Sequence, residues 1–179
     1  MESEYISFPY GSLVSMKSIV LHSVTIGRFC IIERDCLIRP NTIIGDYVKL
    51  MPGTKIGENC KLDDYVNTSG YCEIGNNVRI KRQTMIGQAV RIKDNAWIGS
   101  GVRTTRIKYP KVTGLPEKEE WITVEEYAMI GSSVLLLAGV TVGHHAIIGA
   151  GALVTKDCEP YGVYIGSPAR LVRYNKKEE

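Results

Sequence analysis

The sequence predicts an all-β chain that winds into a triangular prism of short parallel strands. Two observations support this fold class: a large aliphatic residue recurs at every sixth position through most of the chain, and a small residue follows it four positions later. Such a period fits neither the alternation of a half-buried strand nor the turn of a helix. A short strand followed by a corner does fit, and three such sides would close a coil of about eighteen residues.

The aliphatic series begins at Val20 and continues in steps of six to Ile98. Thirteen of these fourteen positions hold isoleucine, leucine or valine, and the exception is Thr68. The series resumes at Val124 and ends at Val154, with an aliphatic residue at all six positions. Because each hexad supplies one wall of a coil, we expect just under seven coils and a prism about 30 Å long.

The small position of the repeat holds every cysteine of the chain: Cys30, Cys36, Cys60, Cys72 and Cys158. No Cys-x-x-Cys pair occurs among them and their number is odd, which disfavours a zinc site or a set of disulfides. We therefore expect small buried side chains with free thiols, which suit a reducing cytoplasm.

A single domain, 1–179, contains the repeat and three segments that lie outside it. The interruption after the first block of hexads contains prolines and a charged run, which predicts a loop extruded from the wall. Long loops on rigid scaffolds often carry function. The predicted boundaries are 1–19 for an N-terminal cap, 20–103 and 124–159 for β-helix coils, 104–123 for the extruded loop, and 160–179 for a C-terminal return strand and short basic helix.

The charge balance excludes several classes of partner. The formal net charge is +3, from 22 basic and 19 acidic residues, which is too balanced for a dedicated nucleic-acid or membrane-surface binder. No apolar run approaches the roughly 18 residues that a membrane span requires, and the N-terminus lacks the pattern of a secretion signal. We therefore expect a cytoplasmic protein with a small-molecule substrate and with no nucleic-acid or membrane partner.

Two C-terminal motifs narrow the interpretation: Gly-Ala-Gly-Ala at 149–152 followed by Thr-Lys-Asp at 155–157, and Gly-Ser-Pro-Ala-Arg at 166–170. Together with the hexads and the single extruded loop, they resemble the hexapeptide-repeat acyltransferases over roughly residues 20–175. The resemblance implies a left-handed β-helix, a homotrimer, acetyl-CoA or another acyl-CoA as co-substrate, and the branch that acetylates sugars. The hexads alone leave the chemistry open, because γ-class carbonic anhydrases and non-enzymatic subunits share this prism.

Coenzyme A needs small residues, so that its pantetheine arm can lie against backbone amides, and cations for its phosphates. The candidate cofactor-binding residues are Gly131, Gly149, Ala150, Gly151, Lys156, Ser167, Arg170 and Arg173. An alternative stays open, in which the glycines only fit tight corners of the coils and the basic residues are solvated.

The loop departs from the family at the catalytic position. In galactoside and maltose O-acetyltransferases, a histidine before a proline acts as general base, and here Tyr109 precedes Pro110. In nucleotide-aminosugar N-acetyltransferases, an asparagine positions the amine, and here Arg106 takes that place. A tyrosine with a pKa near its reference value of about 10 is a poor base at neutral pH. Tyr109 and Arg106 are nevertheless the candidate catalytic residues of the loop.

The three histidines are the remaining candidates for a base. His144 is the favoured one because its coil follows the loop, whereas His22 lies more than four coils away and His145 shares an outward corner with His144. Thr105 and Lys108, in the loop, are candidate substrate-binding residues. A hydroxyl acceptor needs a base, but an amine that is already partly neutral needs less help, which weakly favours an amino group of a sugar or nucleotide-sugar.

Two other functions occur on prisms of this kind. A γ-class carbonic anhydrase would need three histidines converging on zinc, and the spacing of these histidines does not provide them, so no metal site is expected. A non-catalytic scaffold or oligomerisation protein with a degenerate active site remains the alternative, because the loop lacks the usual residues of the family.

Overall fold

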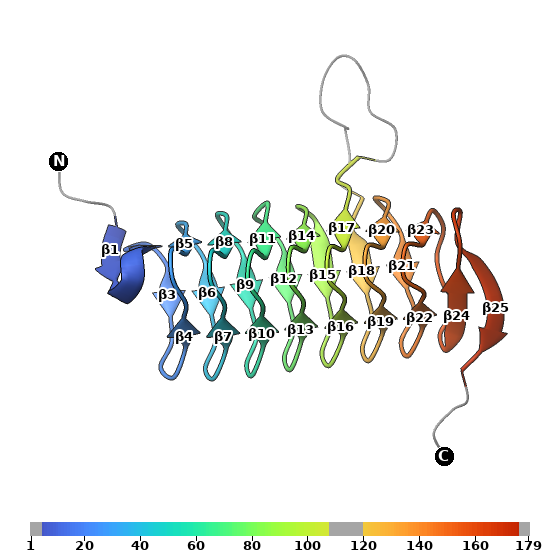
Figure 1. Ribbon diagram of the computed structural model, residues 1–179, viewed down its shortest axis with the longest axis horizontal. Coiled ribbons are helices and arrows are strands. Elements are labelled where there is room, and N and C mark those ends of the chain that lie inside the picture. The colour runs from blue at the N-terminus through green and yellow to red at the C-terminus, as the bar shows by residue number, and fades with distance from the viewer. Residues whose placement is uncertain (1–4, 108–119, 176–179) are drawn as a thin grey trace, which may run out of the picture.

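The computed structural model describes residues 5–107 and 120–175, and it shows a left-handed parallel β-helix whose three sheets form the three walls of a prism (Figure 1). We call these walls sheets A, B and C. Sheet A contains β1 (Tyr5–Phe8), β2 (Ser12–Ser15), β5 (Ile31–Ile32), β8 (Lys49–Leu50), β11 (Asn67–Thr68), β14 (Met85–Ile86), β17 (Arg103–Thr104), β20 (Leu135–Leu136) and β23 (Leu153–Val154).

Sheet B contains β3 (Ile19–Val20), β6 (Leu37–Ile38), β9 (Lys55–Ile56), β12 (Glu73–Ile74), β15 (Val90–Ile92), β18 (Ile122–Val124) and β21 (Thr141–Val142). Sheet C contains β4 (Thr25–Ile26), β7 (Ile43–Ile44), β10 (Lys61–Leu62), β13 (Arg79–Ile80), β16 (Trp97–Ile98), β19 (Met129–Ile130), β22 (Ile147–Ile148), β24 (Gly162–Ile165) and β25 (Arg170–Tyr174).

The register between strands confirms the coil of eighteen residues. In β10 and β13, Lys61 pairs with Arg79 and Leu62 pairs with Ile80. The first residue of each strand, Lys61 or Arg79, faces solvent and the second, Leu62 or Ile80, is fully buried, because a two-residue strand directs successive side chains to opposite faces. The aliphatic series therefore forms the core, as the period predicts.

Thr68, the exception in the aliphatic series, has a polar partner inside the prism. Its Oγ1 lies 2.8 Å from Oγ1 of Thr54 and accepts a hydrogen bond of 3.0 Å from the amide of Met51. Because the hydroxyl is paired, the buried polar group does not carry the full cost of desolvation.

The wall begins earlier than the hexad series. Strand β2 pairs in parallel with β5 and so forms the first level of sheet A, within the segment 1–19 that the sequence assigned to a cap. Strand β1 pairs antiparallel with β2 and leads into it through a short 3-10 turn, η1 (Pro9–Gly11). The outer edge of β2 is thereby covered, which removes a row of unpaired backbone groups.

The short C-terminal helix predicted by the sequence is wrong. Residues Arg170–Tyr174 form strand β25, which pairs antiparallel with β24 and closes the far end of sheet C (Figure 1). Val172 and Tyr174 favour extended backbone, and the unpaired edge of β24 offers them hydrogen bonds that an isolated helical turn could not match. Among the described residues, the three-residue η1 is the only helical segment. It is far too short to cross a bilayer.

The five cysteines are buried and free, as expected from their place in the repeat. Burial raises the pKa of all five thiols, and it raises those of Cys72 and Cys158 to about 12. A thiol with a raised pKa stays protonated at mildly alkaline pH, and the protonated form is a poor nucleophile. The cysteines therefore serve as small core residues.

A core variant tests the energetic importance of the aliphatic series. Ile80 has no exposed surface, so Ile80→Ala should lower the free energy of unfolding by about 3 kcal/mol, as measured by urea denaturation. The control is Lys61→Ala, on the solvent face of neighbouring strand β10, which should change it by less than about 0.5 kcal/mol. Equal effects would contradict the assignment of inside and outside.

Thiol reactivity tests the burial of the cysteines. At about pH 8, the native protein should react with an aromatic disulfide reagent at less than about one-hundredth of the rate of the urea-unfolded chain, because the thiols are covered and protonated. The unfolded chain should release five equivalents of chromophore, one for each cysteine. Rapid reaction of the native protein would show that at least one thiol is accessible.

Candidate functional site

Each coil has three corners, which we name AB, BC and CA after the sheets that they join. The extruded loop leaves the prism at an AB corner, between β17 and β18 (Figure 1). At its root, Thr105 is tied to the following coil: its Oγ1 accepts a hydrogen bond of 2.9 Å from the amide of Ala138, and its own amide donates to the carbonyl of Leu136 at 3.0 Å. Arg106 is half-buried beside it. Tyr109 and Lys108 lie outside the described residues.

His144 lies at a BC corner, within a cluster of rings. Its Nδ1 is 3.1 Å from Nδ1 of His145, and its ring meets the ring of Tyr161 edge-on at 5.0 Å. The His145 ring is itself stacked between Tyr127 and Tyr161, at 4.8 and 4.9 Å. Within one chain, therefore, His144 and the root of the loop lie on different edges of the prism.

The glycines of the predicted cofactor strip fall into two groups. A Cβ at Gly131 would lie 2.6 Å from the amide nitrogen of Ala150, and a Cβ at Gly149 would lie 2.7 Å from the Ile165 side chain. Gly131 is required by the close approach of backbone from the next coil, whereas an alanine at Gly149 would need the exposed Ile165 side chain to move. By contrast, Ala150 and Gly151 are exposed, and a Cβ at Gly151 would meet no atom within 4 Å.

Most amides of this strip already have acceptors. The amides of Gly131, Gly149 and Gly151 donate to the carbonyls of Ile148, Tyr164 and Ser132, each at 2.8 Å. They belong to the ladder that joins successive coils. A bound pantetheine arm would therefore find exposed wall at Ala150 and Gly151 rather than a row of open donors along the whole strip.

Two of the predicted phosphate-binding cations lie together. Lys156, at the last AB corner, and Arg170, at the start of β25, line one pocket of about 260 Å³. Its other lining residues are Asp157, Cys158, Tyr164, Ala169 and Leu171. Ser167 is exposed in the turn before β25, and Arg173 is exposed opposite Val163 but does not line the pocket.

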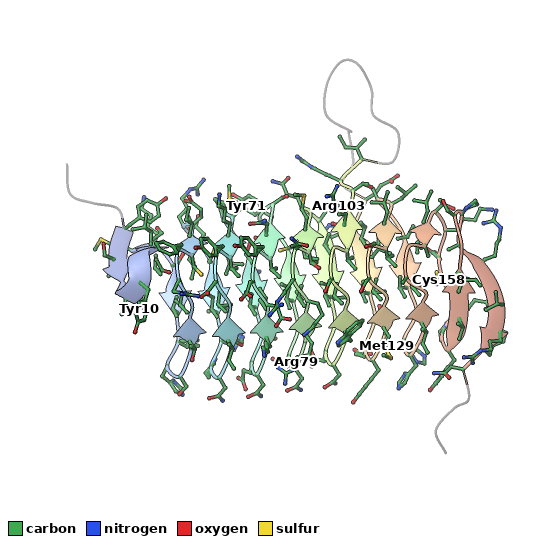
Figure 2. All side chains as sticks on the ribbon, viewed as in Figure 1. Tyr10, Tyr71, Arg79, Arg103, Met129 and Cys158 are labelled. Carbon is green, nitrogen blue, oxygen red and sulfur yellow. The ribbon has the colours of Figure 1, made fainter. Side chains whose placement is uncertain are left out.

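A larger cleft, which the sequence pattern does not predict, lies at the AB corners beneath the loop. Its volume is about 650 Å³, and it is lined by Asp35, Gly53, Lys55, Tyr71, Glu73 and Trp121. We call it the AB cleft. Figure 2 shows Tyr71 on the same edge of the prism as the extruded loop. Its lining residues come from separate coils and from the residue that precedes β18, so no short motif brings them together.

Charged groups in the AB cleft are paired. Arg91 donates from Nε to Glu73 at 2.9 Å, and Lys55 approaches the other carboxylate oxygen at 3.5 Å. The hydrogen bond from Arg91 is the main reason that the pKa of Glu73 is lowered, so the carboxylate is ionised at neutral pH. The same guanidinium lies over the Trp121 ring, 4.8 Å from its centroid. Within the described ranges, no three histidine, cysteine or carboxylate side chains gather as metal ligands would.

Comparison with known proteins connects this fold to a family. The bacterial transferase hexapeptide (six repeats) family matches residues 35–70 and 122–156. A galactoside O-acetyltransferase of Escherichia coli K12 is 46% identical over 52 residues, which cover 29% of this chain and 26% of that enzyme. A chloramphenicol acetyltransferase of Agrobacterium fabrum is 52% identical over 44 residues, or 25% of this chain and 21% of that enzyme.

The likeness in three dimensions extends much further along the chain. The polySia specific acetyltransferase NeuO superimposes with a TM-score of 0.65 over 88% of this chain and 77% of its own, at 15% sequence identity. The chain therefore shares the fold of that protein, whereas it spans less than a third of the length of the curated relatives that it matches. The chain therefore contains two segments of bacterial transferase hexapeptide repeats and has the fold of this acetyltransferase.

Proposed function

We propose that this protein is an acyl-CoA-dependent acyltransferase, with acetyl-CoA as donor, that acts on an amino or hydroxyl group of a sugar or nucleotide-sugar. The observation that carries the proposal is the shared position of three features on one edge of a hexapeptide-repeat prism. The AB cleft, the extruded loop and the pocket with Lys156 follow one another along the AB corners. The names of the curated relatives, which are acetyltransferases, support the same reaction class.

The proposed acyl transfer depends mainly on aligning the acceptor with the thioester carbonyl. The acceptor nitrogen or oxygen forms a bond to the acetyl carbonyl carbon, and the carbon–sulfur bond of the thioester breaks. The proton lost by the acceptor leaves through a base, and the departing thiolate gains a proton to give the coenzyme A thiol. Holding both reactants in line and stabilising the oxyanion of the intermediate provide most of the rate.

The proposed contacts lie along the AB edge and at the C-terminal end of the prism. Lys156 and Arg170 hold phosphates of the donor, with Ser167 and Arg173 as further contacts. Ala150 and Gly151 lie at the last CA corner, so their exposed surface would meet a pantetheine arm on the AB edge only across a contact between subunits. Near the loop, Arg106 and Thr105 orient the acceptor, together with Lys108 and Tyr109 of the loop itself. His144, on another edge, would reach this site only across a contact between subunits, which the proposed homotrimer would supply.

Release of coenzyme A tests the proposed function directly. The full-length protein is incubated with acetyl-CoA and a panel of amino sugars, neutral sugars and nucleotide-sugars, and the thiol is measured spectrophotometrically. We expect acceptor-dependent thiol release. Failure to bind acetyl-CoA at millimolar concentration in calorimetry would favour a scaffold protein instead. The buried cysteines of the native protein should give a low background in this assay.

A charge-removal variant tests the donor site. Arg170→Ala should raise the KM for acetyl-CoA about fivefold with little change in kcat, because a charge-assisted contact to a phosphate is lost before chemistry begins. The matched control is Arg79→Ala, an exposed arginine of β13 that lies midway along the prism in Figure 2, several strands of sheet C away from β25. An unchanged KM in Arg170→Ala would remove this residue from the donor site.

A pair of glycine variants separates packing from ligand contact. Gly131→Ala should lower the free energy of unfolding by about 2 kcal/mol, because its Cβ would collide with the backbone of the next coil. Gly151→Ala should cost only about 1 kcal/mol, from its positive φ of 70°, but should raise the KM for acetyl-CoA. If Gly151→Ala leaves the KM unchanged, the exposed wall is not used by the donor.

A further inference from the structure

The AB cleft presents two aromatic rings from different coils. The Tyr71 side chain is exposed over more than half its surface, and a Cβ at Gly53 would come within 2.7 Å of the Tyr71 ring. The missing side chain at Gly53 therefore lets the ring lie close against the wall. Trp121 lines the same cleft, and Arg91 stacks over its ring. Aromatic faces of this kind pack against the apolar C–H groups of a sugar ring.

Charged side chains of the AB cleft offer both donors and acceptors. Glu73 lies between Lys55 and Arg91, and the carboxylate of Asp35 accepts a hydrogen bond of 2.8 Å from Arg34. A sugar hydroxyl both donates and accepts hydrogen bonds, so paired charges of opposite sign match it better than a single charge does. Both carboxylates, Glu73 and Asp35, line the cleft, where they can accept hydrogen bonds from hydroxyl groups.

A diphosphate would fit the AB cleft poorly. Its recognition requires cations whose charge is not already compensated. Lys55 and Arg91 share Glu73, and Asp35 would repel an anion that entered beside them. The charge pattern therefore favours a neutral or amino-substituted ring over the phosphate groups of a nucleotide-sugar.

We propose that the AB cleft is the acceptor subsite and that it binds a pyranose ring between Tyr71 and Trp121, with Glu73 and Asp35 accepting bonds from its hydroxyl groups. This inference rests on the proposed function, because it names where the acceptor of the transferase is held. Tyr71 and Trp121 are then specificity-determining residues, and the nucleotide part of any nucleotide-sugar lies outside the cleft.

Tryptophan fluorescence can report on this cleft directly. The chain has two tryptophans, and Trp97 lies on the outer face of β16 in sheet C, away from the AB corners. In full-length Trp97→Phe, emission comes from Trp121 alone. D-glucosamine, methyl β-D-galactopyranoside and inorganic pyrophosphate are titrated separately. We expect a saturable change in emission with at least one of the sugars and none with pyrophosphate.

A matched pair of tyrosine variants identifies the ring that is used. In the Trp97→Phe background, Tyr71→Ala should weaken sugar binding about tenfold. Its backbone tolerates alanine, because Ala89 holds the next AB corner with a φ of 54°. The control is Tyr65→Ala, which removes an equally exposed tyrosine from a CA corner and should leave the affinity unchanged. Thermal unfolding of both variants verifies that they are folded.

The possible outcomes distinguish failure of the sugar-subsite proposal from failure of the proposed transferase function. A response to pyrophosphate without a response to either sugar would overturn the sugar subsite and identify an anion site. Equal losses in Tyr71→Ala and Tyr65→Ala would also overturn it. Acetyl transfer to a sugar whose KM is unchanged in Tyr71→Ala would reject the cleft but retain the transferase. Sugar binding that depends on Tyr71, without any acetyl transfer, would retain the cleft and reject the transferase.

Discussion

The interaction on which this structure depends is the stacking of identical positions in successive coils. Leu62 lies in register with Ile44 on one side and Ile80 on the other, so each side chain is buried by its counterparts eighteen residues away. A coil that lost register would expose its apolar side chains and leave its backbone ladder unpaired. The same stacking brings the backbone of the next coil within contact distance of Gly131. Packing alone therefore explains the glycine at this position, without a bound ligand.

Strict register also determines where irregular chain can be added. A wall cannot accept an insertion without displacing its neighbours, whereas a corner can project outward while the strands on either side keep their partners. Strand β17 remains paired with β14 and β20, and β18 remains paired with β15 and β21, across the loop that separates them. The loop therefore replaces one AB corner, and the prism beneath it stays rigid enough to position a binding site.

Periodicity predicted the coils because it encodes which side chains point inward, and it also placed all five cysteines correctly. It could not predict β25, since the preference of Arg170–Tyr174 for a strand depends on the open edge of β24, and both strands lie outside the hexad series. It placed His144 at a corner but did not identify which of the three edges that corner belongs to, because the path of the interrupting loop determines on which sheet the repeat resumes. The AB cleft is not predictable from the period for a related reason: Tyr71 and Trp121 line the same cleft only because coils stack and the chain returns to the wall after the loop.

The AB edge gives the proposed reaction a spatial order. Tyr71 and Lys156 lie four AB corners apart, with the loop between them, which corresponds to about 19 Å along the prism axis. A coenzyme A molecule whose phosphates lie near Lys156 would extend its thioester toward the loop, while a sugar in the AB cleft would approach from the other side. Positive charge is less compensated at the donor end, and the acceptor end is nearly neutral, so each reactant would be recognised by the end whose chemistry it matches.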